Sequence, residues 1–278
     1  YKTDPPIMIG GNRRGTVTKI CGDQARTYEF ENRGPVYSVC LDPFSEDNCL
    51  ILWKTHWALY TVGDVFYKNG ATSTPDSESK KTRSPRKYKF AGVKSVTDIT
   101  LINECGDSSY NFSYATWSTT VIGQFFTSDY CNGNIRIWTC SSPKETQIIK
   151  VDQTGIEAIL SMKSDCLLIS FTDGTIGVYD IVNRCFLLKN QSGHLNSIFS
   201  IQNSPMEKST IVSCSGEGHI CLYNLDEMQF VQKLYLPINN QIGYILTMKI
   251  SPGGGYLICG HSRGFISIYS LELQKVIS

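Results

Sequence analysis

The sequence predicts an all-β fold built from repeated units of four short strands. The main observation is a motif that opens with a glycine, continues with apolar or β-branched residues at alternate positions, and has an aromatic residue five places after the glycine. The motif recurs at intervals of 41 to 46 residues in the second half of the chain. Alternation with a period of two indicates half-buried strands, and helical periodicity is almost absent.

Four glycines begin the clearest copies of the motif. In "TDGTIGVYDI", for example, Asp173 and Gly174 form a polar turn that leads into an alternating strand. Glycine and aspartate at this position favour a tight turn between two strands. We expect structural roles for the glycines and for the aromatic residues that follow them. The glycines are Gly133, Gly174, Gly218 and Gly264, and the aromatic residues are Trp138, Tyr179, Tyr223 and Tyr269.

Three further strand-like runs accompany each motif. Runs such as "CLLISF" precede the turn, runs such as "SIFSI" lie before those, and runs such as "FLLKN" follow the aromatic residue. Four strands in about 40 residues, here called a to d, are the pattern of a β-propeller blade. The first blade lacks strand a, so we expect the missing strand, or a seventh blade, upstream of Tyr1. Six blades are recognisable, at about 7–30, 35–90, 93–150, 155–190, 196–236 and 243–278.

These blades resemble those of the WD-repeat family of β-propellers. In "SFTDGTIGVYDI", Tyr179 and Asp180 stand where the family often has Trp-Asp, and "SGHLNSIFSI" carries the family's Gly-His pair at Gly193 and His194. The resemblance implies a hydrogen-bonded network of a His, a Ser or Thr on strand b, an Asp in the b–c turn and a Trp on strand c. No blade has all four residues, since the blade of His194 has Glu217 in its turn. We therefore expect apolar packing between blades to hold the fold together.

The composition gives no overall bias toward nucleic acid or membranes. Among 278 residues, 26 Lys and Arg balance 25 Asp and Glu, for a net charge of +1. No apolar run reaches the roughly 18 residues that a membrane-spanning helix needs, so we expect no membrane insertion. The 11 cysteines contain no Cys-x-x-Cys pair. We expect reduced core cysteines in an intracellular protein, and no zinc site.

Catalytic and cofactor-binding patterns have little support. The 4 histidines form no His-x-His or His-x-x-x-His pair that would suit a metal. The glycine-rich stretch "GGGY" at 253–256 lacks the lysine of a phosphate-binding loop. We therefore expect no enzyme activity, no metal, no cofactor and no small-molecule substrate.

Two stretches depart from the period of the repeats, and such departures often carry function. The first, 68–87, is rich in Ser, Thr, Pro and Lys, and we expect a flexible basic loop. This loop suits an acidic partner or nucleic acid, with a solvated linker as the alternative. Thr74 and Ser84 precede prolines and are candidates for phosphorylation. The basic residues of the loop are Lys80, Lys81, Arg83, Arg86 and Lys87.

The second stretch, 104–122, contains aromatic residues and is predicted to be an insertion between strands a and b of the third blade. This assignment follows from aligning "KYKFAGVKSVTDITL" with "IIKVDQTGIEAIL", which makes 87–90 strand d of the second blade. The resemblance to the WD-repeat family then implies that both insertions lie on one face, opposite the b–c turns. Exposed Tyr and Trp favour interfaces, so we expect a docking surface here, with packing against its own blade as the alternative. The aromatic residues are Tyr110, Phe112, Tyr114 and Trp117.

The b–c turns form a second candidate surface for partners. Arginine in these turns suits bidentate contacts to carboxylates or phosphates. The alternative is ordinary turn chemistry, because turns need polar residues in any case. The candidate residues are Arg13, Arg14, Asp173, Glu217 and Arg263, together with His194.

The family resemblance implies a non-catalytic platform for protein–protein interactions. We expect a scaffold subunit or adaptor of a larger intracellular complex, located in the cytoplasm, the nucleus or both, with other proteins as partners. The alternative is binding of RNA or DNA through a local basic surface, for which the stretch 80–89 is the first candidate. The sequence leaves both open, although the balanced charge does not favour nucleic acid.

Overall fold

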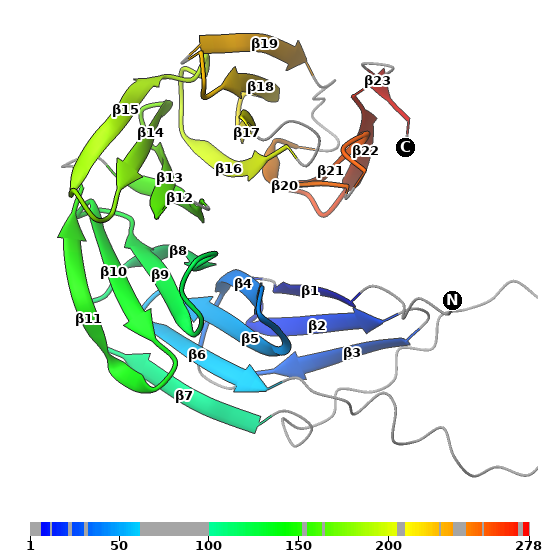
Figure 1. Ribbon diagram of the computed structural model, residues 1–278. Coiled ribbons are helices and arrows are strands. Elements are labelled where there is room, and N and C mark those ends of the chain that lie inside the picture. The colour runs from blue at the N-terminus through cyan, green and yellow to red at the C-terminus, as the bar shows by residue number, and fades with distance from the viewer. Residues whose placement is uncertain are drawn as a thin grey trace, which may run out of the picture. The chain divides into compact units, whose positions relative to one another are not determined.

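The computed structural model of the chain describes residues 7–11, 13–21, 24–30, 33–61, 100–151, 155–162, 165–204, 209–227, 229–235, 243–251, 253–271 and 275–277. These residues form strands and turns, and the described part of the chain contains no helix (Figure 1). The chain divides into two compact units, unit 1 at residues 1–107 and unit 2 at residues 108–278.

Unit 1 contains two antiparallel sheets. The first sheet has the order β1-β2-β3, with β1 at Ile7–Gly11, β2 at Thr16–Cys21 and β3 at Gln24–Glu29. The second has the order β4-β5-β6-β7, with β4 at Val36–Asp42, β5 at Ser45–Trp53, β6 at His56–Thr61 and β7 at Thr100–Gly106. The two sheets share one apolar core, which includes Tyr28, Phe30, Trp53 and Tyr60.

Unit 2 contains four antiparallel sheets of four strands each. The first is formed by β8 (Phe112–Trp117), β9 (Gln124–Asp129), β10 (Asn134–Thr139) and β11 (Ser142–Lys150). The second is formed by β12 (Ile156–Ser161), β13 (Cys166–Phe171), β14 (Thr175–Asp180) and β15 (Cys185–Gln191). The third is formed by β16 (Ile198–Asn203), β17 (Thr210–Ser215), β18 (His219–Asn224) and β19 (Gln229–Tyr235). The fourth is formed by β20 (Ile245–Ile250), β21 (Tyr256–His261), β22 (Ile266–Ser270) and β23 (Lys275–Val276).

Each sheet is a propeller blade whose strands pair in chain order. In unit 2 the first strands lie side by side, with β8 next to β12, β12 next to β16, and β16 next to β20. We call the first strand of each blade its inner strand. The predicted all-β β-propeller fold is confirmed, with six blades in the described part of the chain (Figure 1). We number these blades 1 to 6 in chain order.

Apolar cores lie between successive blades of unit 2. One core joins Phe126 and Ile135 of blade 3 to Ile169 and Phe171 of blade 4. Two more cores join blade 4 to blade 5 and blade 5 to blade 6 in the same way. A blade therefore buries both of its faces only when its neighbours are present, which is how stacked repeats gain stability.

The glycines of the repeated motif adopt a backbone conformation that other residues avoid. The φ angle is +60° at Gly133, +81° at Gly174 and Gly218, and +84° at Gly264. Each of these glycines lies in a turn between strands b and c. A side chain is strained at such positive φ, so the turn itself explains why glycine recurs at this place in the sequence.

A β-bulge recurs near the start of the inner strand in each four-stranded blade. The pairing register with the next strand shifts by one residue at Tyr37, Ser113, Glu157, Phe199 and Leu246. A bulge leaves one extra residue outside the regular pairing and redirects its side chain. The residues at these bulges differ in type from blade to blade.

The structure corrects the predicted boundary between blades 2 and 3. The outer strand of blade 2 is β7, Thr100–Gly106, which pairs with β6. The stretch 104–122 is therefore no insertion: it contains the end of β7, a connection, the inner strand β8 and the connection to β9. The predicted strand d at 87–90 lies outside the described residues. The error has a physical cause, because an outer strand is largely exposed and shows little apolar alternation.

The predicted basic loop also lies outside the described residues. This applies to the whole of 68–87 and to the two candidate phosphorylation sites, Thr74 and Ser84. The expectations for Lys80, Lys81, Arg83, Arg86 and Lys87 therefore remain predictions from the sequence.

Replacing Gly155 with alanine should destabilise the protein, because the start of β12 packs against the preceding blade. A Cβ atom at residue 155 would lie 2.5 Å from the carbonyl oxygen of Tyr130 and 2.9 Å from Cγ2 of Thr172. We expect a loss of about 1–3 kcal/mol in the free energy of unfolding, measured by urea denaturation. Gly253→Ala is the matched control, since a Cβ atom there meets nothing within 4 Å. Equal unfolding midpoints for the two variants would contradict the close packing.

Candidate functional site

The b–c turns of unit 2 lie at the same end of the four sheets as the starts of the inner strands. Pairing of Ile156 at the start of β12 with Phe171 at the end of β13 shows this arrangement. We call this end of unit 2 the turn end. It comprises the turns at 130–133, 172–174, 216–218 and 262–265 and the connections that lead into the inner strands.

Backbone hydrogen bonds fix the turns against the inner strands. The N–H of Tyr130 donates to the carbonyl of Asn111 at 2.8 Å, and the N–H of Thr172 donates to the carbonyl of Gly155 at 3.1 Å. In blade 6 the N–H of Ser262 donates to the carbonyl of Tyr244 at 2.9 Å. The side chains of the turn end therefore project from a fixed backbone, as a binding surface requires.

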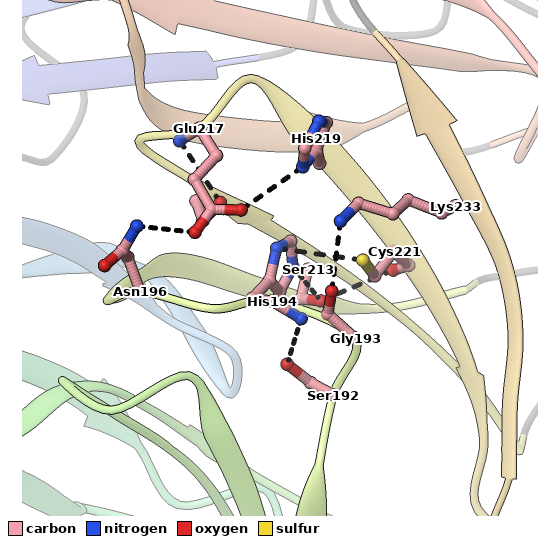
Figure 2. Close-up of polar contacts among 10 residues, drawn as sticks. Ser192, Gly193, His194, Asn196, Ser213, Glu217, His219, Cys221 and Lys233 are labelled. Carbon is pink, nitrogen blue, oxygen red and sulfur yellow. Dashed lines mark hydrogen bonds and ion pairs between the residues drawn. The ribbon is translucent and has the colours of Figure 1, made fainter.

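His194 lies buried beneath the turn end in blade 5 (Figure 2). Its Nε2 is 2.9 Å from Oγ of Ser213 on β17, and its Nδ1 is 3.7 Å from Sγ of Cys221 on β18. Burial lowers the pKa of His194 from 6.5 to about 4, a shift that the charge of Glu217 opposes. His194 is therefore neutral near pH 7, and it ties the connection before β16 to the middle of its sheet rather than contacting a partner.

A partly exposed polar cluster lies close to His194. One carboxylate oxygen of Glu217 accepts a hydrogen bond from Nδ2 of Asn196 at 2.6 Å, and the other is 3.3 Å from Nδ1 of His219 (Figure 2). Lys233 of β19 donates to the carbonyl of Gly193 at 3.2 Å. Glu217 thus stands in the turn where the family has Asp, but its carboxylate contacts Asn196 and His219, and His194 instead contacts Ser213 and Cys221.

The other predicted residues of the b–c turns are more exposed. Asp173 caps its own turn, because its Oδ1 accepts hydrogen bonds from the N–H and the hydroxyl of Thr175 at 2.9 and 2.6 Å. Arg263 is exposed in the turn of blade 6, and Arg13 and Arg14 are exposed in a turn of unit 1. The structure brings His194 and Glu217 into one blade and places Asp173 and Arg263 in the blades on either side.

The motif aromatics are all buried, at 5% exposure or less for Trp138, Tyr179, Tyr223 and Tyr269. Trp138 also contacts strand b of its blade, because its Nε1 donates a hydrogen bond to Oγ1 of Thr127 at 2.8 Å. Gly174 closes the turn of blade 4 at positive φ.

The prediction that the aromatic residues of 104–122 form an exposed docking surface is wrong, because most of these side chains are buried or partly buried. Phe112 is 1% exposed and Trp117 is 4% exposed, and both lie on the inner strand of blade 3. Tyr114 on the same strand is partly buried against the cores on either side of blade 4. Tyr110 packs on Phe112, with 4.9 Å between ring centroids, and edge-on to Trp138 at 6.1 Å. These residues fill their own blade, which was the alternative left open by the sequence.

An ion-pair cluster beside Tyr110 was not singled out from the sequence. Arg136 on β10 lies 3.1 Å from a carboxylate oxygen of Asp129 and 3.3 Å from one of Glu145. Its guanidinium carbon is 4.8 Å from the centroid of the Tyr110 ring, and the Tyr110 hydroxyl donates to Glu145 at 3.2 Å. Burial raises the pKa of Asp129, while the charge of Arg136 lowers it in part. The three charged residues come from three different strands and form no recognised sequence motif.

Exposed apolar side chains gather at the turn end. The exposed fraction is 81% for Leu195, 52% for Phe265, 43% for Tyr130 and 42% for Tyr244. They come from the b–c turns of blades 3 and 6 and from the connections that lead into the inner strands of blades 5 and 6. The opposite end of the sheets also exposes Ile122 and Val182, at 76% and 72%. Single exposed apolar residues are common on proteins, whereas several at one end indicate a contact surface.

The stretch from Gly260 to Gly264 matches the Gly-x-Ser-x-Gly pattern of hydrolases, but it forms a turn between β21 and β22 rather than the strand-to-helix turn that this motif requires. His261 pairs with Ser267 at 2.8 Å. Within the described ranges, no group of three or more His, Cys, Asp or Glu side chains could hold a metal ion. Nor does this part of the chain contain a helix that is long and apolar enough to cross a membrane.

The fold defines a β-propeller protein. Its blades in unit 2 share a b–c turn with a glycine at positive φ. A family model for the WD domain, G-beta repeat, matches residues 185–224, which include His194 and most of blade 5. Together with the six blades, this match supports the resemblance of the repeated units to WD repeats.

Curated relatives share part of this sequence. The chain is 29% identical over 125 residues to the U3 small nucleolar RNA-associated protein 15 of Schizosaccharomyces pombe, a match that covers 45% of this chain and 24% of the relative. It is 32% identical over 101 residues to the guanine nucleotide-binding protein subunit beta of Nicotiana tabacum, covering 36% of this chain and 24% of the relative. The matches thus span about a quarter of each relative's length.

Proposed function

We propose that this protein is a non-catalytic platform for protein–protein interactions, acting as a scaffold subunit or adaptor of a larger intracellular complex. The observation that carries the proposal is the turn end of unit 2, where Leu195, Phe265, Tyr130 and Tyr244 expose apolar surface on a hydrogen-bonded backbone. Aromatic side chains on a rigid support contribute much of the affinity at protein interfaces. Polar residues beside them, such as Glu217 and Arg263, would form the rim.

The names of the relatives support this proposal. A guanine nucleotide-binding protein subunit beta is by its name a subunit of an assembly, and the fission yeast relative is by its name associated with a small nucleolar RNA. The second name favours the nucleus as one location. It also keeps the alternative function in view, which is binding of RNA or DNA through the basic residues Lys80, Lys81, Arg83 and Arg86 within the same complex.

Changing two exposed residues of the turn end should remove the partner without unfolding the protein. In the double variant Leu195→Ser and Phe265→Ser, we expect recovery of partner proteins to fall by about tenfold or more, because residues at the centre of an interface dominate its affinity. The measurement is affinity purification of the full-length protein followed by quantitative mass spectrometry. Thermal unfolding should be unchanged, since both side chains are exposed.

The matched control changes the opposite end of the sheets. Ile122→Ser and Val182→Ser remove side chains of similar exposure and should leave the partners in place. If instead the control loses the partners and the first variant keeps them, the docking surface is not the turn end. If recovery depends on salt and falls when Lys80, Lys81, Arg83 and Arg86 are changed to Ser, the nucleic-acid alternative is supported.

A further inference from the structure

Glu157 is the one charged residue at the bulge position of the four inner strands of unit 2. It lies on β12, one residue from the start of the strand and close to the turn end. The equivalent residues of blades 3, 5 and 6 are Ser113, Phe199 and Leu246. Because a bulge redirects the side chain of its extra residue, blade 4 presents a carboxylate where its neighbours present uncharged groups.

The surroundings of Glu157 are fixed on the side of blade 3. The carbonyl of Tyr130 packs so closely on Gly155 that a Cβ atom there would lie 2.5 Å away. Gly155 also accepts the hydrogen bond from Thr172, and the hydroxyl of Ser197 donates to the carbonyl of Thr172 at 3.2 Å. These contacts place the Tyr130 turn beside the start of β12. The charge of Glu157 is the largest cause of a raised pKa at Tyr130, in keeping with that proximity.

On the side of blade 5, the inner strand next to Glu157 carries an aromatic residue at the equivalent position. Phe199 occupies the bulge of β16, the inner strand next to β12. Its ring centroid lies 6.2 Å from that of Tyr244, and its ring edge packs on Gly216, where an added Cβ atom would be 3.1 Å away. Phe199 is half-buried and Tyr244 is exposed. The bulge of β12 that carries Glu157 therefore has the Tyr130 turn of blade 3 on one side and β16 of blade 5, with Phe199 at its bulge, on the other.

The charge of Glu157 has no cationic partner in the part of the chain that the structure describes. The ion pairs of Arg33, Arg136 and His219 do not include Glu157, and no cation contributes to the pKa shift of its carboxyl. Burial raises the pKa of the Glu157 carboxyl, and the Ser197 side chain opposes this only in part. A half-buried carboxylate without a cation is unfavourable by itself and favours the approach of a positive group.

We propose that Glu157, Tyr130 and Phe199 form an acceptor for an arginine or lysine side chain of the partner protein. The carboxylate supplies the charge-assisted contact, and the aromatic rings suit both the cation and the apolar stem of such a side chain. The partner segment at the turn end is accordingly basic at this point and apolar where it meets Leu195 and Phe265. This inference rests on the proposed function and adds the chemistry of the partner.

Peptide titrations with the full-length protein test the acceptor directly. The probes are fluorescein-labelled heptapeptides of Gly and Ser with arginine, lysine, citrulline or norleucine at the centre, and the readout is fluorescence anisotropy. We expect the arginine and lysine peptides to bind about tenfold or more tightly than the citrulline peptide, which has nearly the shape of arginine without its charge. Equal affinities, or no measurable binding by any peptide, would overturn the proposal.

Two charge-neutralising variants localise the effect. Glu157→Gln should bring the arginine peptide to the affinity of the citrulline peptide. Asp180→Asn changes a carboxylate at the opposite end of the sheets that already has Asn183 as a partner, and it should leave the affinity unchanged. An unchanged affinity in Glu157→Gln contradicts the acceptor. Partner recovery separates the two proposals: partners kept by Glu157→Gln but lost by Leu195→Ser and Phe265→Ser would refute the acceptor and retain the platform.

Discussion

Replacing Trp138 with alanine is expected to reduce the free energy of unfolding by about 3–5 kcal/mol. The indole is fully buried, stacks on Phe125 at an interplanar angle of 11°, and meets Tyr110 and Phe112 edge-on. Its Nε1 also holds Thr127 on the adjacent strand. The loss is a large fraction of the roughly 5–15 kcal/mol that stabilises a typical domain. Urea denaturation followed by circular dichroism measures it.

A phenylalanine at the same position separates packing from hydrogen bonding. Trp138→Phe keeps an aromatic ring against Phe125 but leaves the hydroxyl of Thr127 without the indole donor. We expect this variant to lose about 1–3 kcal/mol, less than the alanine variant. If both variants lost the same amount, the hydrogen bond rather than the aromatic packing would carry the stabilisation. A loss below about 1 kcal/mol for alanine would show that the neighbouring rings close the cavity.

The turn glycines and the buried aromatic residues of the motif could be predicted from the sequence, because each position requires one kind of residue. Gly174 and Gly218 recur because their turns need positive φ, a requirement that few residues satisfy. Tyr179 and Tyr223 recur because each fills the space between two blades. This spacing of a glycine and an aromatic residue can be recognised even where the family's Trp-Asp ending is replaced. The fold class could therefore be predicted without any other information.

The boundary between blades 2 and 3 could not be predicted from alternation alone. The outer strand β7 is mostly exposed and has no strong apolar face. In β8 the bulge at Ser113 interrupts the period of two, so that Phe112, Tyr114 and Trp117 do not fall on one alternating face. A run of aromatic residues without clear alternation then resembled an insertion, although these residues are the inner strand of blade 3.

The candidate site was predicted in part, because its residues are defined by neighbours from other blades. The Gly-His pair at His194 was visible as a motif, and the structure adds that Ser213 and Cys221 are its contacts. Glu157 carried no signal, since its significance comes from Tyr130 and Phe199 on adjacent blades and from the absence of an ion pair among the described residues. A single sequence does not reveal which carboxylates will lack a cation.

Acidification is expected to destabilise the protein through His194. Burial lowers the pKa of this imidazole from 6.5 to about 4. Between these pH values the unfolded chain binds a proton at His194 that the folded protein does not, so the free energy of unfolding falls as the pH falls. The contribution is complete above pH 6.5 and is lost as the pH approaches 4. A shift of this size corresponds to a loss on the order of 3 kcal/mol.

The comparison of His194→Leu with the wild type isolates this contribution from that of the carboxylates. The variant should be less stable at pH 7 by about 1–2 kcal/mol, because Ser213 and Cys221 lose their partner. It should nevertheless lose less stability than the wild type between pH 6.5 and 4.5, so that the two curves converge in acid. Parallel curves for His194→Leu and the wild type would show that His194 accepts a proton in the folded protein, which its burial against the strand-b serine opposes.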